Sequence, residues 1–255
     1  MFLLQIKTPE GYVSNGAFVG IFYELFVLIS LALLIANVYR IYYITKLKIT
    51  LNLFVGFFFY ALAIFFSWIA KIYLWKHMES ALEGPYWLQL IYKFKISLAC
   101  VVVANFFILQ FFKTIFNKHF TKELQIIVII VKIIEIVVIL IIHIPAYLVR
   151  SSEIAYTTDT IAFLIICLDM LFCIPFGIKS FRSVHKEAFG KKYLHFGLMA
   201  FFLVNIFIMF AIDRLTMMLG MMGPFGEPGY TPFYFAAWMS AIASIIFAIY
   251  GIILK

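Results

Sequence analysis

The sequence predicts an all-α integral membrane protein, a seven-transmembrane-helix bundle with its N-terminus outside and its C-terminus cytoplasmic. Apolar residues make up 65% of the 255 residues and charged residues only 13%, whereas a typical soluble domain is about 25% charged. The apolar residues fall in runs of about twenty, which is the length a helix needs to cross a bilayer. Basic residues gather on alternate connections between these runs, and that asymmetry predicts the orientation.

Four apolar runs follow a short polar tail, residues 1–16, which is too polar at its end to be a membrane span. Charged residues and turns then separate the predicted helices, which cover residues 17–39, 51–73, 91–112 and 124–148. The basic residues Arg40, Lys46 and Lys48 close the first helix, and the Gly84-Pro85 turn separates the second from the third. Pro145 is expected to bend the fourth helix.

The remaining three helices are predicted at residues 160–178, 193–211 and 233–254. A polar loop is expected at residues 150–159, before the fifth helix. A Gly/Pro-rich loop, GMMGPFGEPGYTP, separates the sixth helix from the seventh. Residues 1–255 are predicted to form one membrane domain, because no polar stretch is long enough to make a second one.

The basic residues are distributed unequally between the two ends of the predicted bundle. Connections on one side carry twelve Lys or Arg against two acids, and those on the other carry seven against seven acids. The positive side is expected to be cytoplasmic, in a multi-pass protein of the cell membrane. This asymmetry accounts for the net charge of +8 without a nucleic-acid partner, so membrane lipids are the expected contacts of the basic loops.

Three charged residues are predicted to form an intramembrane cluster. All ionisable groups of the fourth helix fall on one stripe at 100° per residue, and this stripe should face protein or water, since a charge in lipid is costly. Lys132 and Glu135 lie near the middle of that helix, and Asp169 lies at a similar depth on the fifth. We expect Lys132 to bridge Glu135 and Asp169, either as a structural ion pair or as a proton, ion or ligand site.

A second set of polar and aromatic side chains is predicted near the outer ends of the helices. Helical spacing places several of them at one level, where they could line an outward-opening pocket: Glu24, Tyr60, Ser67, Lys71, His143, Tyr147, Arg150, Tyr234 and Trp238. For any one of the aromatic residues, lipid contact or core packing is the simpler explanation. The convergence of four ionisable groups favours a pocket.

No catalytic residues, metal site or cofactor are predicted. The five histidines show no metal-binding spacing, and no nucleotide-binding or nucleophile motif is present. The architecture resembles that of microbial rhodopsins, and Ser240-Ala241-Ile242 is faintly similar to the Ser-Ala-Lys around the retinal-binding lysine of that family. Ile242 stands where the resemblance would require the lysine, so a covalent retinal at that position is excluded.

The leading functional hypothesis is a receptor or sensor that binds an apolar or amphipathic ligand from the outer side. It would signal through its basic cytoplasmic loops to a cytoplasmic or membrane partner. The alternative is a proton- or ion-coupled transporter or channel that uses Lys132 and the intramembrane carboxylates. A lipid-modifying enzyme built on the same carboxylates is a third hypothesis. A closed buried cluster below a pocket would favour the receptor, and a polar path reaching both faces would favour transport.

Overall fold

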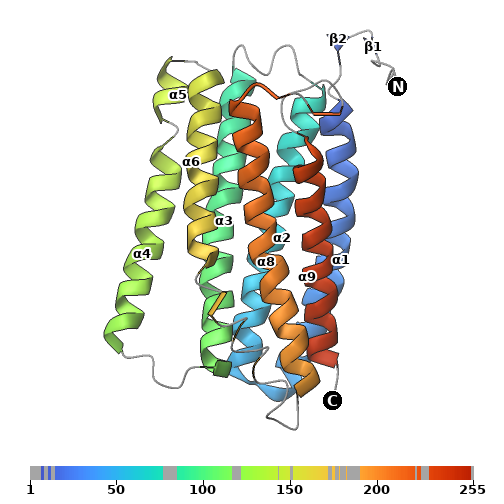
Figure 1. Cartoon of the computed structure of the whole chain (residues 1–255), viewed down its shortest axis with the longest axis vertical. Coiled ribbons are helices and arrows are strands. Elements are labelled where there is room, and N and C mark those ends of the chain that lie inside the picture. The colour runs from blue at the N-terminus through green and yellow to red at the C-terminus, as the bar shows by residue number, and fades with distance from the viewer. Residues whose placement is uncertain are drawn as a thin grey trace.

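The computed structural model shows a bundle of helices that run side by side along one long axis (Figure 1). It describes residues 7–8, 11–12, 15–76, 85–116, 122–142, 144–149, 152–171, 174–175, 178, 182, 190–221, 223–224 and 230–253. The start of α1 and the end of α9 lie at opposite ends of this bundle (Figure 1). We call the end with the start of α1 the hairpin end and the opposite one the basic end.

The helices are α1 (Asn15–Thr45), α2 (Lys48–Lys76), α3 (Pro85–Phe116), α4 (Lys122–Ile141), α5 (Ile144–Val149), α6 (Ser152–Leu171), α8 (Gly190–Met218) and α9 (Pro232–Ile253). Two short strands precede them, β1 (Lys7–Thr8) and β2 (Gly11–Tyr12). These strands pair antiparallel, with Lys7 opposite Tyr12. The strand pair lies within the tail that was predicted to be merely polar.

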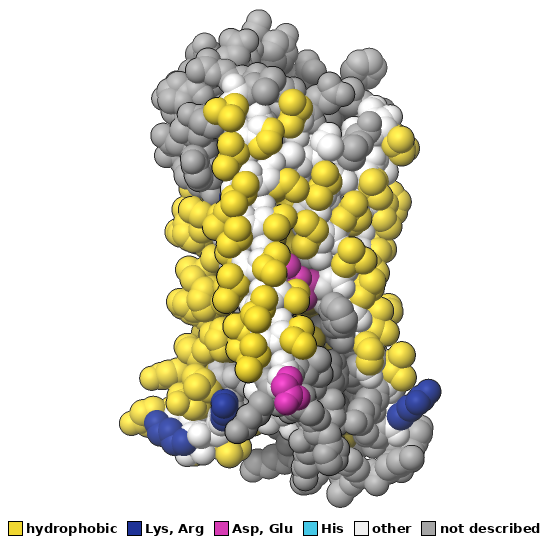
Figure 2. All heavy atoms as spheres, turned by 90° about the vertical axis from the view of Figure 1, so that its left-hand side faces the viewer, with side chains coloured by type: hydrophobic (Ala, Val, Ile, Leu, Met, Phe, Trp, Pro, Cys, Tyr) yellow, Lys and Arg dark blue, Asp and Glu magenta, His cyan; other side chains and the backbone are white. Residues whose placement is uncertain are grey.

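Five of these helices are long and apolar enough to cross a membrane, at Phe18–Thr45, Lys48–Ile72, Lys95–Ile115, Tyr193–Met217 and Pro232–Ile252. On the face that Figure 2 shows, apolar side chains cover most of the length of the bundle, and Lys and Arg side chains lie at the basic end. Such an apolar surface is what a bilayer requires of a protein that spans it. The chain is therefore a multi-pass helical membrane protein in contact with lipid.

Several helix boundaries differ from the sequence prediction, and two of these differences concern the fourth and fifth predicted helices. The fourth helix was predicted to be continuous over residues 124–148, but α4 ends at Ile141 and α5 begins at Ile144. Pro145 explains the break, because proline lacks an N–H and its ring clashes with the preceding helical turn. The predicted polar loop at residues 150–159 is wrong, since α6 already begins at Ser152.

The early start of α6 follows from its buried face. Thr158, Ala162, Ile166 and Met170 are spaced by four residues, and each is at most 7% exposed. Thr158 therefore extends the buried face of α6 by one turn toward its N-terminus. This burial lets the helix include residues that were expected to form a loop. The predicted end of this helix at residue 178 lies beyond the continuously described part of the chain.

The core of the bundle lies among α1, α2, α3, α8 and α9, where the closest packing is between α2 and α3 and between α8 and α9. Helix α4 lies at the edge and packs mainly on α3 (Figure 1). Of its described residues, only Lys132 and Ile139 are buried, and the remaining Ile, Val and Leu side chains are mostly exposed. These exposed side chains are the apolar surface expected of a helix that faces lipid.

Candidate functional site

The hairpin-end cluster consists of Glu24 on α1 and Ser67 and Lys71 on α2. The Lys71 ammonium forms an ion pair with Glu24 Oε1, and it also donates to Ser67 Oγ at 3.0 Å. The Ser67 hydroxyl in turn donates to Glu24 Oε1 at 2.8 Å. Glu24 is fully buried and Lys71 is 5% exposed. The four-residue spacing of Ser67 and Lys71 places both side chains on the α2 face that meets α1.

Aromatic rings of α9 close around the Lys71 ammonium. Its Nζ lies 5.6 Å from the centre of the Tyr234 ring and 5.9 Å from that of Trp238, within the range of cation–π attraction. Gly20 on α1 allows this approach, because a Cβ there would lie 2.6 Å from Tyr234 Oη and 3.2 Å from Lys71 Cδ. A glycine at this position therefore brings α1, α2 and α9 together.

A cavity of about 110 Å³ lies beneath this cluster. Its walls come from six helices, α1, α2, α3, α6, α8 and α9, and they are mainly apolar. Lys71 and Tyr60, which precedes it by eleven residues on α2, both line the cavity. This separation corresponds to roughly 16 Å at the helical rise. A cavity of this size can hold a small molecule, since a buried apolar cavity of about 150 Å³ accommodates benzene.

Four buried polar atoms on the lining residues lack a hydrogen bond of ordinary geometry with the described part of the chain. They are Glu24 Oε2, Arg214 Nε, Tyr234 Oη and Trp238 Nε1. Buried polar atoms are nearly always hydrogen-bonded in native proteins, and leaving one without a partner costs about 1–3 kcal/mol. Four such atoms on one cavity therefore mark a place where a ligand or ordered water would be stabilised.

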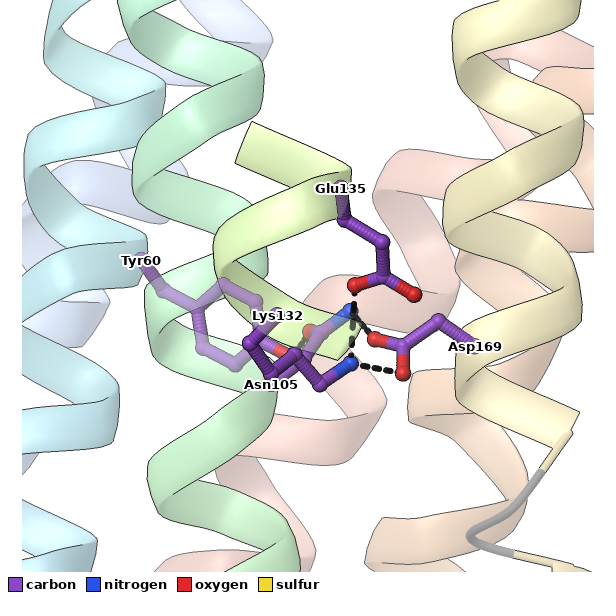
Figure 3. Close-up of polar contacts among 5 residues, drawn as sticks. All are labelled: Tyr60, Asn105, Lys132, Glu135 and Asp169. Carbon is purple, nitrogen blue, oxygen red and sulfur yellow. Dashed lines mark hydrogen bonds and ion pairs between the residues drawn. The ribbon is translucent and has the colours of Figure 1, made fainter. Parts of the chain in front are cut away.

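The central cluster joins four helices across the bundle. Lys132 on α4 contacts Glu135 Oε2 at 3.0 Å and forms an ion pair with Asp169 Oδ1 on α6. Asn105 on α3 donates to Asp169 Oδ2 at 2.9 Å, and Tyr60 on α2 donates to Asn105 Oδ1 at 2.6 Å. Figure 3 shows these five side chains converging from their helices. The two contacts of Lys132 are those predicted from helical periodicity and depth.

The central cluster also determines how α4 meets the bundle. The residues of α4 that are not exposed include Val128, Lys132, Glu135 and Ile139, whose spacing of three and four residues defines one face of the helix. The described part of the charged stripe, Lys132 and Glu135, thus faces protein. Because Lys132 is one of two buried side chains among the described residues of α4, its ion pair with Asp169 is a main attachment of this helix.

Six of the nine predicted pocket residues line the cavity: Glu24, Tyr60, Ser67, Lys71, Tyr234 and Trp238. His143, Arg150 and the side chain of Tyr147 lie outside the described residues. The described residues of α4 and α5 contribute nothing to the lining. The charged stripe of α4 contacts the bundle through Lys132 instead.

Sequence reasoning missed Arg214 as a cavity residue. The sixth helix was predicted to end at Ala211, which left Arg214 in a loop, but α8 continues to Met218. The extra turns bring its guanidinium to the cavity wall, with Cζ 5.5 Å from the centre of the Phe163 ring. Its neighbour Asp213 accepts from Thr231 N at 3.0 Å, a link between α8 and the start of α9 that could have indicated the longer helix.

Apolar side chains make up most of the described core between the central cluster and the basic end, where Asn52 is also buried. Leu34, Leu53, Ile108 and Phe112 lie closer to that end along their helices, and each is at most 1% exposed. The hydrogen bonds of Tyr60 and Asn105 therefore connect across the bundle to α4, on the hairpin-end side of this apolar layer. Compared with models of protein families, with curated proteins and with solved structures, the chain matches none of them.

Proposed function

We propose that the chain is a small seven-helix receptor or sensor of the cell membrane, which binds an amphipathic small molecule in the cavity beneath the hairpin-end cluster. In this proposal α4 with α5 and α6 supply two spans besides the five long apolar helices. The basic end is cytoplasmic, in accord with the excess of Lys and Arg there. The ligand enters from the hairpin end, and the basic loops contact a signalling partner.

The observation that supports ligand binding most strongly is the set of four unpartnered polar atoms around one apolar cavity. An apolar pocket with a few converging polar groups is the usual form of a small-molecule site. The polar atoms would orient the head of a ligand, and side chains such as Leu31, Phe57 and Phe207 would surround its apolar part. The apolar layer beneath the central cluster favours a receptor over a transport path.

The central cluster supplies a route from the cavity to the lipid-facing helix α4. Tyr60 belongs to the cavity wall, and its hydroxyl is hydrogen-bonded through Asn105 to the carboxylate that holds Lys132. A ligand that changes the hydrogen bond of Tyr60 would alter the attachment of α4, which has few other buried contacts. In this proposal the position of α4 relays ligand binding to the basic end, as a two-state element would.

A substitution that fills the cavity tests whether ligands bind there. We expect Val101→Phe, which places a larger side chain in the cavity wall, to abolish the increase in unfolding temperature that cavity-binding compounds give to the wild type. Val131→Phe adds the same group to the exposed face of α4 and should leave that increase intact. The measurement is thermal unfolding in nanodiscs with a panel of small amphipathic compounds. Equal responses of both variants and the wild type would show that ligands do not use this cavity.

The orientation is tested by cysteine labelling in intact cells. A cysteine that replaces Lys46, in the exposed turn between α1 and α2, should react with a membrane-impermeant maleimide only after the cells are permeabilised. A cysteine that replaces Leu219, which is 77% exposed at the other end, should react without permeabilisation. The reverse pattern would overturn the proposed topology.

A proton- or ion-coupled transporter or channel is the second candidate function. The observation that favours it is the bonded series of polar groups from Tyr60 to Glu135, which contains three charged side chains within the membrane span. Charged groups at this depth often mark proton or ion pathways. Such a path would have to continue from the central cluster through the apolar layer toward the basic end.

A further inference from the structure

The unpartnered groups of the cavity also indicate what kind of head group its ligand carries. Three of the four atoms, Arg214 Nε, Tyr234 Oη and Trp238 Nε1, can donate a hydrogen bond, and only Glu24 Oε2 is restricted to accepting one. A complementary ligand therefore presents mainly acceptor atoms. A hydroxyl, a carbonyl and a carboxylate all meet this condition, whereas a primary ammonium, which has donors alone, does not.

The charges around the cavity decide among the hydroxyl, carbonyl and carboxylate head groups. Lys71 and Glu24 neutralise each other in an ion pair, and Asp213 directs Oδ1 to the backbone N–H and hydroxyl of Thr231, at 3.0 and 2.6 Å. Arg214 is different, because no carboxylate of the described residues lies within 4.0 Å of its nitrogens. One guanidinium thus contributes a positive charge to the cavity wall without a carboxylate in contact.

The contacts of Arg214 leave its hydrogen-bonding capacity largely unused. Its Nη1 donates to Met217 Sδ at 3.2 Å, and a thioether is a weak acceptor. Its Nε is buried without a partner, and the guanidinium lies over the Phe163 ring. Arginine presents parallel N–H groups that match the two oxygens of a carboxylate, and such charge-assisted pairs are about twice as strong as neutral hydrogen bonds.

We infer that the ligand of this cavity is a small amphipathic carboxylate, whose two oxygens pair with the Arg214 guanidinium while its hydrocarbon part fills the apolar walls. This inference rests on the proposed function and specifies the ligand of that site. Trp238 and Tyr234 would donate to the same carboxylate from α9. An alkylammonium ligand is disfavoured, because it would add a third positive charge beside Lys71 and Arg214.

The test compares three compounds that share a six-carbon chain: hexanoate, 1-hexanol and hexylamine. Each is titrated calorimetrically into the protein in phosphatidylcholine nanodiscs, and the signal of Val101→Phe is subtracted to remove partition into lipid. We expect hexanoate to bind at least about tenfold more tightly than hexanol, and hexylamine to give no specific signal. Arg214→Gln should weaken hexanoate binding by about tenfold or more and change hexanol binding by less than about twofold.

Arg214→Lys provides a second variant that retains the charge, and it should give a smaller loss of hexanoate affinity than Arg214→Gln, since lysine cannot pair with both oxygens through one planar group. If hexanol or hexylamine binds as tightly as hexanoate, or if both Arg214 variants bind hexanoate like the wild type, the carboxylate assignment is wrong and the proposed receptor function survives. If none of the three compounds gives a signal above that of Val101→Phe, both proposals fail.

Discussion

We expect Lys132→Met to lower the unfolding temperature of the purified protein by about 6–20 °C, the shift that a loss of about 3–5 kcal/mol produces in a chain of this size. The substitution removes the cation from Asp169, which is 3% exposed and would retain the hydrogen bond that Asn105 donates to it. An uncompensated buried carboxylate is far more costly than the ion pair it replaces. Thermal unfolding in detergent gives the measurement.

Two further variants show whether the unpaired charge is the cause. Lys132→Met combined with Asp169→Leu should recover most of the lost stability, because replacing both partners of a buried ion pair with apolar residues is often nearly neutral. Lys48→Met makes the same change at an exposed position and should alter stability by no more than about 0.5 kcal/mol. If Lys132→Met is as stable as the wild type, the attachment of α4 does not depend on this ion pair.

The second large effect is expected at the hairpin-end cluster, where Lys71→Met should destabilise the protein by about 3–5 kcal/mol. The fully buried Glu24 carboxylate would then lose its ion pair and retain the hydrogen bond that the Ser67 hydroxyl donates to it. Methionine matches the length of the lysine stem beside Gly20, so lost packing contributes little. Glu24→Gln in the same chain should restore part of the stability, since it removes the charge that Lys71→Met leaves unpaired.

Combining Lys71→Met with Lys132→Met tests whether the two clusters are independent. The two clusters share no residue, so the two losses should add within about 0.3–0.5 kcal/mol in the absence of ligand. A larger discrepancy would show that the clusters are coupled through the cavity wall. The measurement is the same unfolding experiment, applied to both single variants and the double variant.

Much of the fold follows from local sequence, because a run of apolar residues long enough to cross a bilayer forms a membrane-spanning helix. The contact of Lys132 with Glu135 and Asp169 was predictable for a related reason. Helical periodicity fixes which residues share a face, and the depth of a charge in its span limits its partners.

Other features depend on packing that one sequence does not reveal. A helix extends where neighbouring helices bury its added turn, as they bury Thr158 of α6. The same effect extends α8, and for this reason Arg214 was placed in a loop and its position on the cavity wall was missed. The position of α4 at the edge of the bundle likewise depends on which helices meet, and periodicity alone does not determine that.

Proton flux into liposomes that contain the purified protein tests most directly whether the buried charges stabilise helices and a ligand site or conduct ions. We expect no flux above that of empty liposomes under a pH gradient or a membrane potential, because the apolar layer of Leu34, Leu53, Ile108 and Phe112 closes the core below the central cluster. A flux that disappears in Glu135→Gln and Asp169→Asn would contradict the receptor and make the central cluster a transport pathway.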